Sequence, residues 1–111
     1  MNTRKFSKRQ EKQVAKEING KVQPNSGATP FYKGDVVTKH FLTDCKTSVE
    51  NKKSYSVKFE DIEKLKKERF GSGKQYEALV FNFGPDTENL YVVTKRTMLD
   101  FIKFLEGEEN E

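Results

Sequence analysis

The apolar residues of this chain fall in short segments whose spacing alternates between helical and extended, and this alternation most constrains the fold. Residues 34–37, 41–46, 78–83 and 90–93 are β-prone and are bounded by Gly, Pro and polar residues, which predicts four strands. Segments with helical spacing precede, separate and follow the two strand pairs. The predicted order is helix, two strands, helix, two strands, helix, which indicates one α/β domain over residues 1–111.

Local signals predict where the helices begin and end. Ser7 followed by Gln10 fits a capping box, so we expect the first helix to start there and to end at Gly20. Ile62 and Leu65 lie on one face of a second helix, and the last helix carries Met98, Leu99, Ile102 and Leu105. Outside these helices we expect a flexible basic arm at residues 1–6 and an acidic tail at residues 106–111.

Composition excludes several classes of protein. Nine Phe and four Tyr in 111 residues are too many for a disordered chain, although charged residues reach 34%. No apolar segment approaches the ~20 residues of a membrane span, and the N-terminus lacks the apolar stretch of a secretory signal. A single cysteine forms no internal disulfide. We therefore expect a cytoplasmic protein that contacts no membrane.

The charge is distributed unevenly along the chain. The formal net charge is +4, but the last six residues contain four glutamates and no base, so the rest of the chain carries +8. A basic body is typical of proteins that bind a polyanion, most often nucleic acid. The alternative is that lysine-rich faces only keep a small protein in solution.

The segment from Gly34 to Lys46 carries the most informative chemistry. If it forms a hairpin whose turn lies between Lys39 and His40, Asp35 and Asp44 face each other on adjacent strands. Two opposed carboxylates repel unless a cation lies between them, and oxygen ligands favour Mg²⁺ or Mn²⁺. Lys39-His40 is a poor two-residue turn, so a longer loop or a shifted register remains open.

Strand alternation assigns different environments to the residues that follow. Lys46 lies on the same face as Asp44, where an ammonium group could hold a water molecule or stabilise charge on a phosphate. Cys45 lies on the other face, and we expect it to be a core thiol rather than a reactive one.

The first helix offers a third carboxylate. Glu11 lies near the centre of the stripe defined by Val14, Ala15 and Ile18, whereas Glu17 lies to one side. An acid on an inward face needs a cationic partner, which a bound metal or Lys46 would supply. The alternative is that Glu11 reaches solvent from the first turns of the helix.

Together, Glu11, Ser26, Asp35 and the Asp44-Cys45-Lys46 triplet resemble the PD-(D/E)xK nuclease superfamily, and most closely its compact Holliday-junction-resolvase-like members from archaea and phages. The resemblance covers roughly residues 7–94. It implies a restriction-endonuclease-like core, with a central mixed sheet of four to five strands flanked by helices. One departure is Gly34, which stands where the family has a proline before the first aspartate.

The resemblance also implies roles for these residues. Glu11, Asp35, Asp44 and the carbonyl of Cys45 would bind one or two Mg²⁺ ions, with Mn²⁺ able to substitute. Lys46 would assist the attacking water, and Ser26 would act at the site or on DNA. The expected activity is metal-dependent, structure-selective cleavage of DNA during recombination, in a prokaryote or a phage-infected cell.

Two further alternatives concern partners. A non-catalytic nucleic-acid-binding module could stack bases on aromatic residues, namely Phe6, Phe31, Tyr32, Phe41 and Tyr55, but it would leave the facing acids unexplained. A nuclease acting on DNA ends or nicks is also open. The last helix is apolar around more than half of its circumference, so Phe101 and Phe104 either form a homodimer contact or lie in an internal groove.

Overall fold

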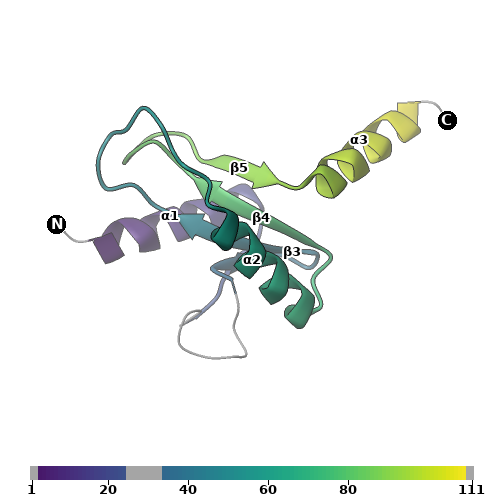
Figure 1. Ribbon diagram of the computed structural model, residues 1–111, viewed down its shortest axis with the longest axis horizontal. Helices are drawn as coiled ribbons and strands as arrows, with labels where there is room; N and C mark the ends of the chain where they lie inside the picture. The colour runs from purple at the N-terminus through teal and green to yellow at the C-terminus, as the bar shows by residue number, and fades with distance from the viewer. Residues whose placement is uncertain (1–2, 25–33, 110–111) are drawn as a thin grey trace.

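A computed structural model describes residues 3–24 and 34–109, which form a five-stranded mixed sheet with helices on both faces (Figure 1). The strands lie in the order β1-β2-β3-β4-β5. The elements along the chain are α1 (Thr3–Glu17), β1 (Lys21–Val22), β2 (Val36–Val37), β3 (Phe41–Lys46), α2 (Phe59–Ser72), β4 (Tyr76–Phe81), β5 (Leu90–Val93) and α3 (Lys95–Glu109). The predicted α/β class and the mixed sheet of four to five strands are confirmed.

The direction of the strands follows from their connections. β1, β2 and β3 are mutually antiparallel, and β4 and β5 form an antiparallel pair. β3 and β4 are parallel. A parallel pair needs a long crossover, and α2 supplies it.

The predicted hairpin register is confirmed. Val36 pairs with Thr43 and Val37 pairs with Leu42, as a turn centred between Lys39 and His40 requires. The poor turn chemistry is compensated by Thr38, whose Oγ1 accepts the amide hydrogen of Phe41 at 2.9 Å. The amide of Thr38 in turn donates to the carbonyl oxygen of Phe41 at 3.0 Å.

Side chains on the two faces of the sheet form two apolar clusters. On one face, Val36 and Val80 pack with Val14 of α1. On the other, Leu42 and Leu79 pack with Leu65 of α2. Because successive strand residues point to opposite faces, Leu79 and Val80 belong to different clusters, and both are fully buried.

Two expectations about the ends of the chain are wrong. α1 begins at Thr3, so the capping box at Ser7 does not start the helix, and residues 3–6 of the expected flexible arm are helical. The helix therefore has one more turn before Ser7 than expected. In this turn Arg4 lies four residues before Lys8, so the two side chains share one face of the helix. α3 continues to Glu109, so much of the expected acidic tail is also helical backbone.

Gly34 has a backbone conformation that accounts for the departure at this position. Its φ is +78°, which a proline, locked near −65°, cannot adopt. A Cβ atom there would lie 2.7 Å from Cγ of the buried Leu42. Glycine therefore lets the chain turn into β2 directly before Asp35.

We expect Gly34→Ala to lower the free energy of unfolding by about 2 kcal/mol, because a left-handed φ and a steric clash add together. The matched control is Gly71→Ala in α2, where a Cβ meets no atom within 4 Å. That change should raise stability by about 0.5–1 kcal/mol, since alanine favours helix. Urea unfolding of both variants makes the comparison, and equal effects at the two positions would contradict it.

Within residues 3–24 and 34–109, no helix is both long enough and apolar enough to cross a membrane.

Candidate functional site

Asp35 and Asp44 come together at the end of the sheet where β2 begins and β3 ends. The amide of Asp35 donates to the carbonyl oxygen of Thr43 at 2.8 Å, and Val36 also pairs with Thr43, so Asp35 lies one residue out of the hairpin register rather than directly opposite Asp44. The two carboxyl groups are still neighbours, and Asp35 raises the pKa of Asp44. The carboxylate of Asp35 then accepts the amide hydrogen of Cys45 at 2.7 Å. Asp35 is thus held against β3 by both its backbone and its side chain.

Lys46 joins this pair from the next position on the same face. Its Nζ lies 3.1 Å from Oδ2 of Asp44. Burial and the adjacent Asp35 raise the pKa of Asp44 to about 6, against the opposing effect of Lys46. Burial opposes ionisation of Lys46, but Asp44 outweighs it and raises the pKa of the ammonium group. The predicted placement of Asp44 and Lys46 on one face is confirmed.

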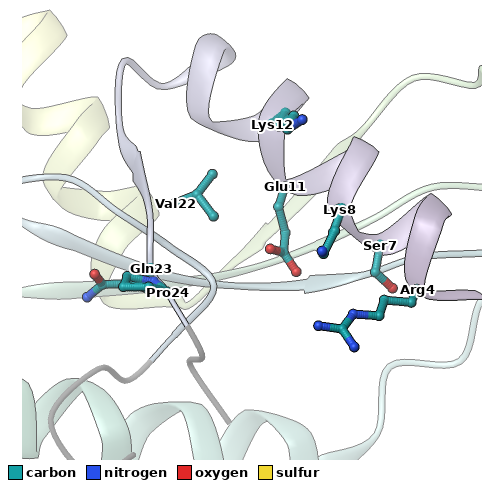
Figure 2. Close-up of a pocket in the computed structure, with 8 residues that line it drawn as sticks. All are labelled: Arg4, Ser7, Lys8, Glu11, Lys12, Val22, Gln23 and Pro24. Carbon is teal, nitrogen blue, oxygen red and sulfur yellow. The ribbon is translucent and has the colours of Figure 1, made fainter. Parts of the chain in front are cut away.

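Glu11 approaches from α1. Burial is the main reason that its pKa rises to about 7, and the charges of Asp35 and Asp44 raise it further, while Lys8 lowers it. These effects place the three carboxylates within electrostatic range of one another. Figure 2 shows Glu11 projecting from α1 into the space between this helix and the segment that carries Val22.

That space is an open pocket of about 520 Å³ with a basic wall. Arg4, Lys8 and Lys12 line it from α1 on both sides of Glu11, as Figure 2 shows. The same helix carries further basic side chains around a second depression, which is lined by Lys5, Lys8, Arg9, Lys12, Gln13 and Lys16. Cations spaced along a helix beside a cluster of acids are suited to hold a phosphate backbone.

The acids do not form a complete ligand set for a metal ion. In the described part of the chain, no group of three or more His, Cys, Asp or Glu side chains is drawn together tightly enough to hold a metal ion. Asp44 pairs with Lys46, and Asp35 accepts the amide hydrogen of Cys45. Ser26, another predicted site residue, lies outside the described residues.

The Cys45 side chain belongs to the core. It packs against the cluster of Val14, Val36 and Val80. Burial raises the pKa of its thiol, and the nearby acids raise it further, so the thiolate is disfavoured. The prediction of a structural thiol is confirmed, while the role of its carbonyl as a ligand stays a prediction.

Sequence reasoning missed Gln10, which is only 2% exposed. Its Nε2 donates to the carbonyl oxygen of Lys46 at 2.9 Å and so ties α1 to the end of β3. Gln10 and Val14 are spaced i, i+4 and are the two buried residues of α1, so Glu11 lies beside the buried stripe rather than at its centre. The signal was available, because a polar residue four positions before a buried valine shares its face.

A polar network continues from Gln10 across the same face of the sheet. Asn82 donates to Oδ1 of Asn89 at 3.3 Å, and Asn89 donates to Glu17 at 3.2 Å. The hydroxyl of Tyr91 donates to the other oxygen of Glu17 at 2.5 Å. Glu17 therefore fastens α1 to β5, which helps to hold α1 and Glu11 in place above the sheet.

Two of the aromatic residues proposed as a base-stacking platform pack against other rings. Phe41 stacks on Tyr76 with a centroid distance of 5.1 Å, and Tyr55 stacks on Phe81 at 4.4 Å. Phe31 and Tyr32 lie outside the described residues. The rings of Phe41 and Tyr55 are thus engaged within the protein.

Comparisons with known proteins supply no relative. Neither the models of protein families, nor the curated proteins, nor the solved structures contain a match to this chain. Its candidate function rests on the geometry described above.

Proposed function

We propose that this protein is a metal-dependent endonuclease that hydrolyses phosphodiester bonds in DNA, with a restriction-endonuclease-like core. The observation that carries the proposal is that Asp35, directly before β2, lies beside Asp44 and Cys45 of β3, and that Nζ of Lys46 lies 3.1 Å from Oδ2 of Asp44. Glu11 lines a neighbouring pocket whose other charged side chains are the bases Arg4, Lys8 and Lys12. Acids, a lysine and a phosphate-binding surface are the parts that metal-assisted phosphodiester hydrolysis needs.

The donor types suit a hard cation, although the side chains would have to draw closer to hold it. Glu11, Asp35 and Asp44 offer carboxylate oxygens, and the Cys45 carbonyl is the further ligand that we assign. The raised pKa values of Glu11 and Asp44 reflect burial and an excess of negative charge, which a divalent ion would offset. When bound, Mg²⁺ or Mn²⁺ would lower the pKa of a coordinated water and neutralise charge on the phosphate.

Lys46 acts as a donor in this proposal. Its pKa is raised by Asp44, so the side chain is an ammonium group at neutral pH and cannot accept a proton from water. It can donate a hydrogen bond to the attacking water or to a phosphate oxygen, and Asp44 holds it in position.

The substrate that we propose is branched DNA, recognised by shape and backbone. The site and its supporting sheet occupy most of the chain, and the exposed charges on α1 are lysines and arginines suited to phosphates rather than to base edges. A four-way junction, a linear duplex and a single strand of matched sequence, each incubated with Mg²⁺ or EDTA, test this choice. Cleavage of the junction at least ~10-fold faster than the duplex supports it.

The same three DNA substrates also test the two alternative functions, which are trimming of DNA ends or nicks and binding without catalysis. Cleavage confined to linear ends or nicks would replace junction selectivity with a trimming activity. Binding of all three substrates with no Mg²⁺-dependent cleavage would overturn the nuclease and support a non-catalytic binding module.

Charge neutralisation on α1 should weaken DNA binding without changing the fold. For the double variant Lys8→Gln, Lys12→Gln we expect weaker duplex binding and a salt dependence whose slope falls by about 2, one for each lost phosphate contact. The matched control is Lys64→Gln, Lys67→Gln on α2, two exposed lysines outside the pocket. Fluorescence anisotropy across a salt series measures both, and equal losses in the two double variants would contradict the assignment of α1 as the DNA-binding face.

A further inference from the structure

Tyr55 lies close to the proposed catalytic lysine, on the segment between β3 and α2. Its ring stacks on Phe81 with a centroid distance of 4.4 Å and an interplanar angle of 11°. Phe81 is paired with Lys46 in the parallel register of β3 and β4. Paired residues of neighbouring strands point to the same face of a sheet, so the stack on Phe81 holds Tyr55 beside Lys46.

The apolar packing and the charges both agree with this position. Tyr55 and Phe81 pack against the cluster under α2 that includes Leu42. Asp44 and Lys46 each lie an even number of residues after Leu42 in β3, so their side chains share its face of the sheet. The charges of Lys46 and Asp44 both act on the phenol of Tyr55, which is therefore within electrostatic range of the two groups.

The Tyr55 hydroxyl is available to a ligand. The side chain is half-buried, and no group within residues 3–24 and 34–109 forms a hydrogen bond with its hydroxyl. Burial and the charge of Asp61, in the first turn of α2, raise the pKa of the phenol, so the hydroxyl keeps its proton at neutral pH. An O–H group in this state can donate a hydrogen bond to an anion that approaches Lys46.

The segment that carries Tyr55 is fastened to the end of β4. The amide of Lys52 donates to the carbonyl oxygen of Phe83 at 2.7 Å. The hydroxyl of Ser48 donates to the carbonyl oxygen of Asn82 at 3.2 Å. These two bonds and the stacked ring hold the segment at three points, which fixes where the Tyr55 hydroxyl lies before any substrate binds.

We propose that Tyr55 is a further catalytic residue of the nuclease proposed above, on which this inference rests, and that its hydroxyl donates a hydrogen bond to a non-bridging oxygen of the scissile phosphate. Negative charge on these oxygens develops as water attacks the phosphorus atom. A donor that is already in place therefore stabilises the transition state more than it stabilises bound DNA. Lys46 and Tyr55 supply two such donors from one face of the sheet.

Tyr55→Phe tests this role, because it keeps the stacked ring and removes only the hydroxyl. We expect single-turnover cleavage in Mg²⁺ to fall by ~100-fold, while DNA binding in EDTA stays within about threefold of wild type. The matched control is Tyr76→Phe, at the opposite end of β4, which removes a hydroxyl that donates to Asp100 at 2.7 Å. This control should cleave at the wild-type rate.

Two negative results have different meanings. If wild type cleaves DNA and the two variants cleave at equal rates, Tyr55 is not catalytic and the nuclease proposal stands. If wild type leaves every DNA substrate intact in Mg²⁺, the nuclease proposal is wrong and the role of Tyr55 is wrong with it.

Sulfur substitution separates contact with the phosphate from an indirect effect of the variant. Each non-bridging oxygen of the cleaved phosphate is replaced in turn by sulfur, a weak hydrogen-bond acceptor. One of the two substitutions should slow wild type ~10-fold more than it slows Tyr55→Phe, because the variant has no hydroxyl to lose. Slowing that arises from the metal or from Lys46 is common to both proteins. Equal slowing of both proteins by each substitution would overturn the inference, since the hydroxyl would then not contact the phosphate.

Discussion

Asp44→Asn is expected to lower the rate of Mg²⁺-dependent DNA cleavage by at least ~1000-fold, since losing a metal-binding carboxylate removes several kcal/mol of transition-state stabilisation. Asparagine keeps the size of the side chain and removes a charge that Asp35 already disfavours. The variant should therefore fold at least as well as wild type and still bind DNA. Single-turnover cleavage of the preferred substrate is the measurement.

The matched control for this variant is Asp86→Asn. Asp86 lies between β4 and β5, has a φ of +64° that asparagine also tolerates, and pairs with Arg9 away from the acids. It should cleave at the wild-type rate. If Asp44→Asn retained cleavage within threefold of Asp86→Asn, Asp44 would not be part of the catalytic site.

Glu11→Gln is expected to have opposite effects on activity and stability. We expect cleavage to fall by ~100-fold, because one metal-binding oxygen is lost. In the absence of metal, the free energy of unfolding at pH 8 should rise by about 1–2 kcal/mol. The pKa shift from 4.5 to about 7 sets an upper limit of about 3.4 kcal/mol, and solvent screening of a half-buried side chain reduces it.

The sign follows from linkage. The folded state holds the Glu11 proton more tightly than the unfolded state, so its carboxyl does not oppose folding below about pH 4.5. Between pH 4.5 and about 7 the unfolded state loses this proton first, and wild type becomes less stable as the pH rises. Glutamine stays neutral, so the stability of the variant should change less over that range.

Urea unfolding at pH 5 and pH 8 in EDTA measures this difference, with Glu60→Gln, an exposed glutamate in the first turn of α2, as the control. Millimolar Mn²⁺ at pH 8 should then raise the thermal midpoint of wild type more than that of Glu11→Gln. If Mn²⁺ left the thermal midpoint of both proteins unchanged, these acids would not bind a divalent cation.

The individual helices and strands could be predicted from the sequence because short-range interactions determine them. β3 and β5 were predicted at their observed bounds, since β-branched and aromatic residues bounded by turns are clear signals. The start of α1 was missed because Ser7 satisfies a capping pattern while lying inside a longer helix. β1 was missed because two residues carry no periodicity, and only pairing with β2 makes Lys21 and Val22 a strand.

The sequence by itself determined the α/β order of elements, the register of the β2–β3 hairpin and the shared face of Asp44 and Lys46, because strand alternation and hairpin pairing are local geometry. It did not show that Asp35 leaves this register and bonds to Thr43. Only the tertiary structure decided how α1 lies on the sheet. Gln10 and Glu17 fasten the helix to β3 and β5 and bring Glu11 toward the two aspartates, through contacts between residues distant in the chain. The outward course of α3 was likewise decided there, because an apolar helix face does not specify which groove it fills.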